Sequence, residues 1–127
     1  MNCQKDRLQN IFRTIGFYGG IQYLTRHHPR ILVYHRFGPD AGDKKRMGLD
    51  MLHKQIDIIR KKCNPISLSR FYKSVTSGKA LPKNAVVITV DDGYEDFFRY
   101  ALPLFEAYRI PVTLFITSDF VDRTTWL

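Results

Sequence analysis

The sequence predicts an α/β protein built on a parallel sheet or barrel. Two observations lead there. First, residues 31–33 and 85–90 are largely apolar runs, and residues 111–118, "PVTLFITS", are expected to form another buried strand. Such runs are typical of strands covered on both faces, as parallel sheets require. Second, the segments between these strands show helical spacing, and strands that alternate with helices indicate a parallel α/β arrangement.

The link between the first two strands predicts two helices. The first is amphipathic, because its apolar residues recur at steps of three and four: Leu49, Leu52, Ile56, Ile59 and Cys63. A short extended piece follows at residues 65–67. The second helix is expected to be capped by Ser67 or Ser69 and to end near Gly78, since serine favours helix starts and glycine helix ends.

A third helix is expected between the strands at residues 85–90 and 111–118. The apolar face predicted for it consists of Phe98, Ala101, Leu102 and Phe105. Pro103 interrupts this pattern, so it either kinks the helix or marks its true start.

Residues 1–29 are predicted to form a basic arm or helix. Leu8, Ile11, Phe12 and Ile15 have helix-like spacing, which Gly16, Gly19 and Gly20 then interrupt. Residues 1–36 carry six basic residues and one acidic residue, a net charge of +5. Peripheral contact with an anionic membrane and packing on the domain both remain open for this arm.

Composition limits the alternatives. The 127 residues suit one domain or part of one, and a 44% hydrophobic content excludes a disordered polymer. The net charge of +8 favours anionic partners. Cys3 and Cys63 lack any CxxC-type spacing and are expected to be free thiols. There is no apolar run of spanning length and no signal-peptide pattern, so a cytoplasmic or membrane-peripheral location is expected.

Two adjacent carboxylates, Asp91 and Asp92, end the most hydrophobic strand. Ligands of parallel α/β folds bind outside the carboxyl ends of the strands, and Gly93 can provide the backbone turn that brings both side chains to one site. Such a pair commonly serves a divalent cation, with one carboxylate as ligand and the other as proton acceptor. The alternative is a pair of capping carboxylates that start the next helix.

The motifs resemble a known family. "TVDDGY" followed by "RIPVTLFI", with "VYHRF" upstream, is similar to the NodB-type polysaccharide deacetylases, which are carbohydrate esterase family 4-like enzymes, over roughly residues 30–122. The resemblance implies an incomplete (β/α) barrel, with parallel strands and intervening helices. It also implies a hydrolase that acts on non-peptide carbon–nitrogen bonds and removes N-acetyl, sometimes O-acetyl, groups from a glycan or sugar precursor.

The resemblance also implies residue roles. Asp91 would be the general base, and Asp92 would bind a divalent metal, zinc or another ion. His35 and Tyr94 would contact substrate. The alternatives are that His35 is half-buried and bonded to backbone, and that Tyr94 packs under the following helix.

Part of the family's site is absent from the sequence. The family's two histidine ligands and its general-acid histidine come from later motifs, and no histidine follows Asp92. Residues 30–127 are therefore expected to be the N-terminal part of a deacetylase domain, truncated before the histidine motif and inactive alone. Arg109 and Val112 replace the glycine and alanine that are common in the family, and Val90 replaces a phenylalanine.

Two other functions remain open. A Mg²⁺-dependent phosphoryl-transfer or phosphatase-like domain also places acidic residues at a strand end, but it would normally have a Gly-rich phosphate loop or a D-x-D spacing. A non-catalytic basic binding module would explain the charge, although the basic residues are scattered. The expected partner is an acetylated glycan or sugar-lipid, and no nucleic acid is expected.

Overall fold

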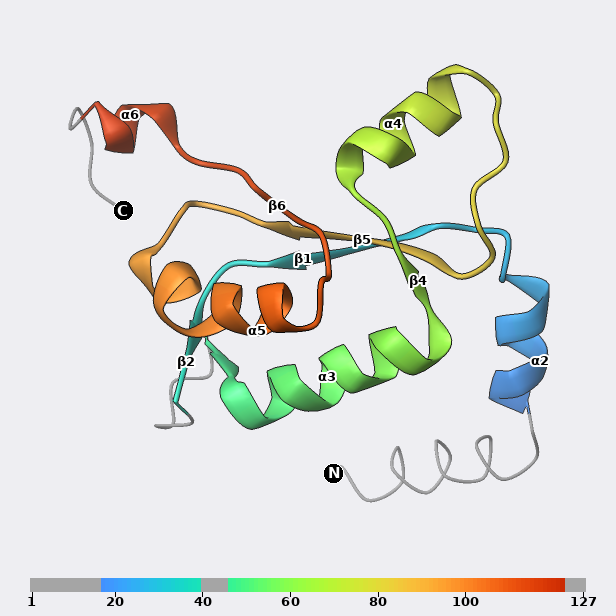
Figure 1. Ribbon diagram of the computed structural model, residues 1–127, viewed down its shortest axis with the longest axis horizontal. Coiled ribbons are helices and arrows are strands. Elements are labelled where there is room, and N and C mark those ends of the chain that lie inside the picture. Colours follow the sequence, from blue (N-terminus) through green and yellow to red (C-terminus); the bar gives the residue numbers. More distant parts are fainter. Residues whose placement is uncertain (1–16, 40–45, 123–127) are drawn as a thin grey trace, which may run out of the picture.

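The computed structural model describes residues 17–39 and 46–122. Its centre is a parallel sheet in which β5 (Ala85–Val90) pairs with three strands (Figure 1). β1 (Arg30–Tyr34) pairs with β5 from Val86 to Val90. β4 (Asn64–Pro65) and β6 (Val112–Leu114) pair with the amino-terminal and carboxyl-terminal parts of β5. This parallel α/β arrangement confirms the predicted fold class.

Helices lie on both sides of this sheet (Figure 1). α3 (Leu49–Lys62) and α5 (Leu102–Ala107) lie on one side, together with the π-helical turn η1 (Phe97–Ala101) that leads into α5. α4 (Leu68–Thr76) lies on the other side. The remaining elements are short: α2 (Phe17–Leu24), α6 (Ser118–Val121) and the two-stranded pair of β2 (Phe37–Gly38) and β3 (Met47–Gly48).

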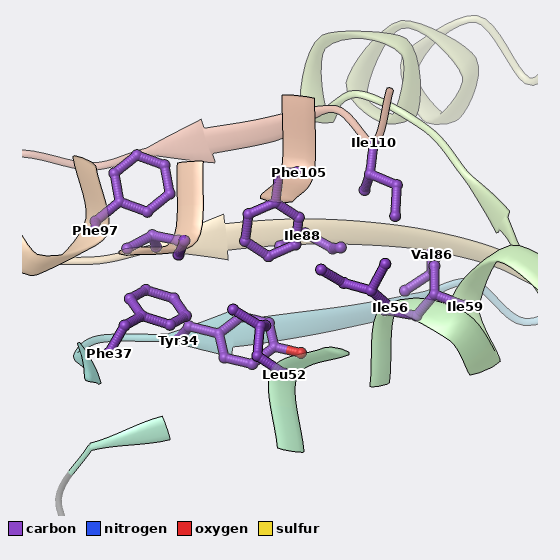
Figure 2. Close-up of a cluster of buried hydrophobic side chains, with 12 residues drawn as sticks. Tyr34, Phe37, Leu52, Ile56, Ile59, Val86, Ile88, Phe97, Phe105 and Ile110 are labelled. Atoms are coloured by element: carbon purple, nitrogen blue, oxygen red, sulfur yellow. The ribbon is translucent and has the colours of Figure 1, made fainter. Parts of the chain in front are cut away.

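The residues of β5 alternate between two apolar clusters. Val86, Ile88 and Val90 belong to the larger cluster, which fills the space between the sheet and α3 and α5 (Figure 2). Ala85 and Val87 belong to a smaller cluster with Ile66, against which Leu68, Phe71 and Leu81 pack. All six residues of β5 are buried, because α4 covers one face of the strand while α3 and α5 cover the other.

β1 differs from its prediction. Its apolar run predicted cover on both faces, but Ile31 and Val33 are 49% and 52% exposed. Leu32 and Tyr34 alternate with them and pack against the larger cluster. The smaller cluster, on the side of α4, includes β5 but no residue of β1. The prediction of cover on both faces is therefore wrong for this strand within the described residues.

The predicted face of the third helix is correct at Ala101, Leu102 and Phe105 but wrong at its first position. Phe97, Ala101 and Phe105 are the buried positions, whereas Phe98, predicted to be in the core, is 52% exposed. The cause is the wide turn of η1, in which the Leu102 N–H donates to the Phe97 carbonyl and so changes the helical phase. Pro103 lies in the first turn of α5, which confirms that it marks a helix start.

The helix caps agree with the sequence. The Ser67 hydroxyl accepts a hydrogen bond from the Arg70 N–H at 3.2 Å and caps α4. After α4 and α5, Gly78 and Arg109 have left-handed backbone conformations, with φ of 66° and 53°. The left-handed Arg109 was expected from its alignment with the family's glycine.

The amino-terminal arm is described only in part. α2 includes Gly19 and Gly20, so the expectation that glycines interrupt the helical pattern is wrong there. Residues 1–16 lie outside the described residues, and the membrane contact predicted for the arm stays a prediction. No helix in the described part of the chain is long and apolar enough to cross a membrane.

Candidate active site

Three parallel strands end at the same level and bring their following residues together. Tyr34, Val90 and Leu114 are register partners across the sheet. The Asp91 N–H donates to the Tyr34 carbonyl at 2.9 Å, and the Phe115 N–H donates to the Val90 carbonyl at 2.8 Å. Residues just past the carboxyl ends of β1, β5 and β6 are therefore held next to one another by backbone hydrogen bonds. This edge is where parallel α/β folds bind ligands.

The chain turns sharply just after β5. Asp92 and Gly93 have φ values of 72° and 73°. A left-handed conformation is sterically costly for a residue with a Cβ, and such residues occur at turns, at helix ends and at functional sites. Gly93 is required for a second reason, since a Cβ there would lie 3.0 Å from Cγ2 of Ile116. The turn predicted at Gly93 is thus present and already begins at Asp92.

His35 and Asp92 meet across the end of the sheet. Nδ1 of His35 lies 3.3 Å from Oδ2 of Asp92, although the residues are 57 positions apart. The His35 and Asp92 side chains are 57% and 35% exposed, so solvent reaches both. An ionised carboxylate only accepts hydrogen bonds, so this contact is a hydrogen bond in the imidazole form that carries a proton on Nδ1. His35 therefore bonds to the carboxylate rather than to backbone.

Asp91 is half-buried next to this pair. Its carboxylate makes no hydrogen bond or ion pair with other residues that the structure describes, whereas its backbone N–H is bonded to β1. The alternative that Asp91 and Asp92 cap a helix is not supported. Among the described residues, neither carboxylate accepts a hydrogen bond from a helix N–H.

Two functional candidates were missed by the sequence interpretation. The Asp96 carboxylate accepts hydrogen bonds from Arg36 Nε at 3.1 Å and from the Phe37 N–H at 3.2 Å. The Arg36 guanidinium lies 4.4 Å from the centroid of the Tyr94 ring. Both residues lie within the motifs "YHRF" and "DDGYED", but nothing in the sequence shows that these two charges pair.

Two clefts open on either side of Arg36. One, of about 340 Å³, is lined by His35 together with Tyr34, Arg46 and Met51. The other, of about 300 Å³, is lined by Tyr94 and Asp96 together with Arg99 and Tyr100. His35 and Tyr94 thus line different clefts that share Arg36. A larger space of about 480 Å³ lies between β1 and α3 and does not include the carboxylates.

Burial changes the acidity of two groups around β1. It raises the pKa of the Tyr34 phenol, whose hydroxyl donates to Oε1 of Gln55 at 2.6 Å. Burial also raises the pKa of the half-buried Cys63 thiol, while Arg30 and Lys62 oppose the shift. Cys63 is a free thiol, as predicted. A raised pKa lowers the fraction of Cys63 that is present as the nucleophilic thiolate.

The described residues do not complete a metal site. No group of three or more histidine, cysteine, aspartate or glutamate side chains in residues 17–39 and 46–122 is arranged to hold an ion. The other three histidines are exposed to solvent. His53 lies on α3, and His27 and His28 follow α2. Asp92 and His35 offer one oxygen and one nitrogen donor, fewer than the three protein ligands of a catalytic zinc site.

The chain is similar in sequence to known deacetylases. Residues 78–126 match the family model for polysaccharide deacetylase. A poly-beta-1,6-N-acetyl-D-glucosamine N-deacetylase of Escherichia coli strain K12 is 29% identical over 94 residues. That match covers 72% of this chain but 14% of the relative, so the chain spans a small part of the length of this relative.

Solved structures share the fold. A de-N-acetylase from Aggregatibacter actinomycetemcomitans superposes with a TM-score of 0.65 at 24% identity, over 74% of this chain and 39% of the other. The Streptococcus pyogenes deacetylase PplD, solved in complex with acetate, gives a TM-score of 0.65 at 19% identity, over 76% and 45%. The described residues therefore share the fold of part of these deacetylases, and residues 78–126 match the polysaccharide deacetylase family model, which confirms the resemblance seen in the motifs.

Proposed function

We propose that these residues belong to a hydrolase that removes N-acetyl groups from a polysaccharide. One observation carries the proposal: within the segment that matches the family, Asp91 and Asp92 stand at the carboxyl end of β5, where Asp92 adopts a left-handed conformation and contacts His35. The bond to be broken joins the acetyl carbonyl to the sugar nitrogen. Its products are acetate and a free amine.

Asp91 is proposed as the general base. Its carboxylate is half-buried and makes no bond to the other described residues, so it is free to accept a proton from the attacking water. Asp92 is given the other role, because its carboxylate already lies within 3.3 Å of His35 whereas that of Asp91 has no such partner among the described residues. His35 holds that carboxylate through Nδ1–H.

Asp92 is proposed as one ligand of a divalent metal, with zinc the expected ion. When bound, such an ion lowers the pKa of a water molecule and polarises a carbonyl. The described residues lack a full ligand set, so we expect the 127-residue chain alone to bind zinc weakly and to release little acetate. Isothermal titration of this chain with Zn²⁺ tests the expectation, and a stoichiometric site with a submicromolar Kd would contradict it.

The proposed substrate is an acetylated glucosamine polymer. The curated relative acts on poly-beta-1,6-N-acetyl-D-glucosamine, as its name states. Clefts beside His35 and Tyr94 provide arginine and tyrosine side chains that can bond and stack on sugar rings. His35 and Tyr94 are accordingly proposed to contact neighbouring parts of one glycan.

The activity test uses the gene product that contains these residues at its natural length. Acetate and free amine are measured with β-1,6- and β-1,4-linked N-acetylglucosamine oligomers. We expect Asp91→Asn and Asp92→Asn each to lower kcat/KM by about 100-fold or more, the effect of losing a general base or a metal ligand. Asp57→Asn, an exposed position on α3, is the matched control.

Two results would overturn the proposal. One is a folded protein that releases no acetate from any of these oligomers with Zn²⁺ present. The other is an activity that survives Asp91→Asn. Phosphate release from an aryl phosphate with Mg²⁺ would instead support the phosphatase-like alternative.

A further inference from the structure

Asp96 joins two segments that lie far apart in the sequence. Both of its carboxylate oxygens are used: Oδ1 accepts from the Phe37 N–H, and Oδ2 accepts from Arg36 Nε. Its side chain is only 10% exposed, whereas that of Arg36 is 33% exposed. A carboxylate that gives up most of its hydration needs such partners, so the residues just after β1 and just after β5 are fastened together at this point.

Aromatic contacts reinforce the same junction. The Arg36 guanidinium lies over the Tyr94 ring, a cation–π arrangement. The Phe37 and Phe97 rings, which follow Arg36 and Asp96 directly, have centroids 6.1 Å apart. We call the set of Arg36, Phe37, Tyr94 and Asp96 the clasp. Charge, hydrogen bonds and ring packing all act in it between the same two segments.

The clasp is adjacent in sequence to the contact between His35 and Asp92. His35 directly precedes Arg36, and Asp92 precedes Asp96 by four residues. On one side of His35, the Tyr34 carbonyl accepts from the Asp91 N–H at 2.9 Å, and on its other side Arg36 donates to Asp96. Both chain neighbours of His35 are therefore bonded to the segment that carries Asp92.

The contact itself is too weak to hold this geometry. It measures 3.3 Å and joins two side chains that are both open to solvent. Exposed pairs of this kind contribute little and do not fix a conformation. A charged pair as buried as Asp96 with Arg36 is, in turn, a poor source of net stability, because desolvation offsets its attraction. Because the pair of Asp96 and Arg36 lies beside the site, we look for its role in the geometry of the site instead of in the stability of the fold.

We propose that Asp96, acting through Arg36 and the Phe37 N–H, is a positioning residue that holds His35 against Asp92. It acts through these two partners and not on the reacting atoms. This inference deepens the proposed function, because the orientation of Asp92 matters only if that carboxylate belongs to the active site. It assigns a role to the second acidic position of the "YED" sequence.

The first test reads the geometry without any activity measurement. In the 127-residue chain at pH 7, the Nδ1–H proton of His35 is followed by ¹H–¹⁵N side-chain NMR. Because the His35 side chain is 57% exposed, we expect partial protection of this proton in the wild-type protein, measured as slower exchange with water than in Asp92→Asn, whose spectrum also identifies the resonance. Asp96→Ala should abolish the protection, and Asp57→Asn should leave it unchanged. Backbone amide spectra show whether each variant is folded.

A second variant keeps the test decisive if Asp96→Ala does not fold. Arg36→Lys retains a positive charge but loses the Nε donor and the planar group over Tyr94. We expect it to be folded and to lose most of the protection of the His35 proton. Full protection in a folded Asp96→Ala or Arg36→Lys protein overturns the positioning role.

The second test separates this role from a general structural effect. In the deacetylase assay described above, Asp96→Asn should lower kcat by about 10- to 100-fold, the usual effect of losing a group that orients a ligand, with KM little changed. Asp96→Glu should recover part of the loss. An equal loss from Asp57→Asn, or a change in KM alone, would contradict the proposal.

The two inferences can fail separately. If the wild-type protein releases no acetate, the proposed function fails, and the NMR measurement still decides whether Asp96 holds His35 against Asp92. If acetate is released but the His35 proton and kcat are unaffected by both clasp variants, the function stands and the positioning role is wrong.

Discussion

β5 and β1 are neighbours in one sheet, yet their environments differ. All six residues of β5 are buried, and its two faces belong to two separate apolar clusters. β1 is paired with β5 over its whole length but is covered on one face only, with Ile31 and Val33 half-exposed. Both strands deliver a residue to the same contact, Asp92 from β5 and His35 from β1.

This difference separates the parts of the site by how they are supported. The carboxylates follow the most buried strand, whose position is fixed by packing on two sides. The imidazole follows a strand fixed by backbone pairing and one apolar face. The clasp between Arg36 and Asp96 adds support on the side where packing is weaker. The site therefore depends on core packing for Asp91 and Asp92, and on polar contacts for His35.

The largest effect is expected from the same substitution made on both strands. Ile88→Ala on β5 removes a side chain that is only 1% exposed, and such changes lower the free energy of unfolding by about 3 kcal/mol. Ile31→Ala on β1 removes a side chain that is half-exposed, so its cost should be about 1 kcal/mol. Urea unfolding followed by circular dichroism measures both.

The contrast between the two strands is contradicted if Ile88→Ala and Ile31→Ala lower the free energy of unfolding equally. Equal costs would mean that Ile31 is covered in solution, and the asymmetry in burial would then not describe the protein. Met51→Ala, at an exposed position of α3, gives the background cost of shortening a surface side chain.

The sequence predicted β5 correctly and β1 only in part, for a physical reason. An apolar run shows that a segment tolerates burial on both faces, but not which element covers each face. The apolar cluster on the side of α4 includes residues of β5 but none of β1. This difference arises from tertiary packing, which no local sequence pattern encodes. In the same way Phe98 was placed in the core, because regular helical spacing cannot anticipate the wide turn of η1.

The site was predictable to the extent that its residues lie in one motif. Asp91, Asp92 and Gly93 follow a recognisable strand, and the turn at Gly93 follows from its conformational freedom. His35 was identified through a second motif, and the register between β1 and β5 brings the two motifs together. Asp96 was missed because its importance depends on Arg36, 60 residues away, and a single sequence does not show such pairings.

A smaller effect is expected at Tyr34, the most buried residue of β1. Its hydroxyl donates to Gln55, so Tyr34→Phe should lower the free energy of unfolding by about 1 kcal/mol at pH 7. Burial raises the pKa of Tyr34 above that of the unfolded chain. The native state therefore keeps its proton when the unfolded state, with a pKa of about 10, loses it. The stability from Tyr34 is complete below about pH 10 and declines as pH rises toward the folded pKa.

The pH dependence gives the measurement its control. The difference in unfolding free energy between wild type and Tyr34→Phe should shrink between pH 8 and pH 11, because only the wild type loses this contribution. Tyr72→Phe, at an exposed position on α4, should show no such trend. If the difference in unfolding free energy between wild type and Tyr34→Phe stays constant from pH 8 to pH 11, then burial does not raise the pKa of the Tyr34 phenol.

The smallest effects concern the ends of the two helices that cover opposite faces of β5. α4 and α5 end in the same hydrogen-bond pattern, with the N–H of Lys79 bonded to the Ser74 carbonyl and that of Ile110 bonded to the Phe105 carbonyl. The left-handed residue is Gly78 after α4 but Arg109 after α5.

Opposite changes at these two positions should have opposite signs. Gly78→Ala should cost about 1 kcal/mol, because a Cβ there meets no atom within 4 Å and only the backbone conformation is strained. Arg109→Gly should stabilise the protein by about 0.5 kcal/mol, since relief of that strain is partly offset by the greater freedom of glycine in the unfolded chain. Thermal unfolding of both variants measures the difference. If Arg109→Gly instead lowers stability, Arg109 contributes contacts that outweigh its strained backbone, and the helix end on that face of β5 is held by its side chain rather than by its cap.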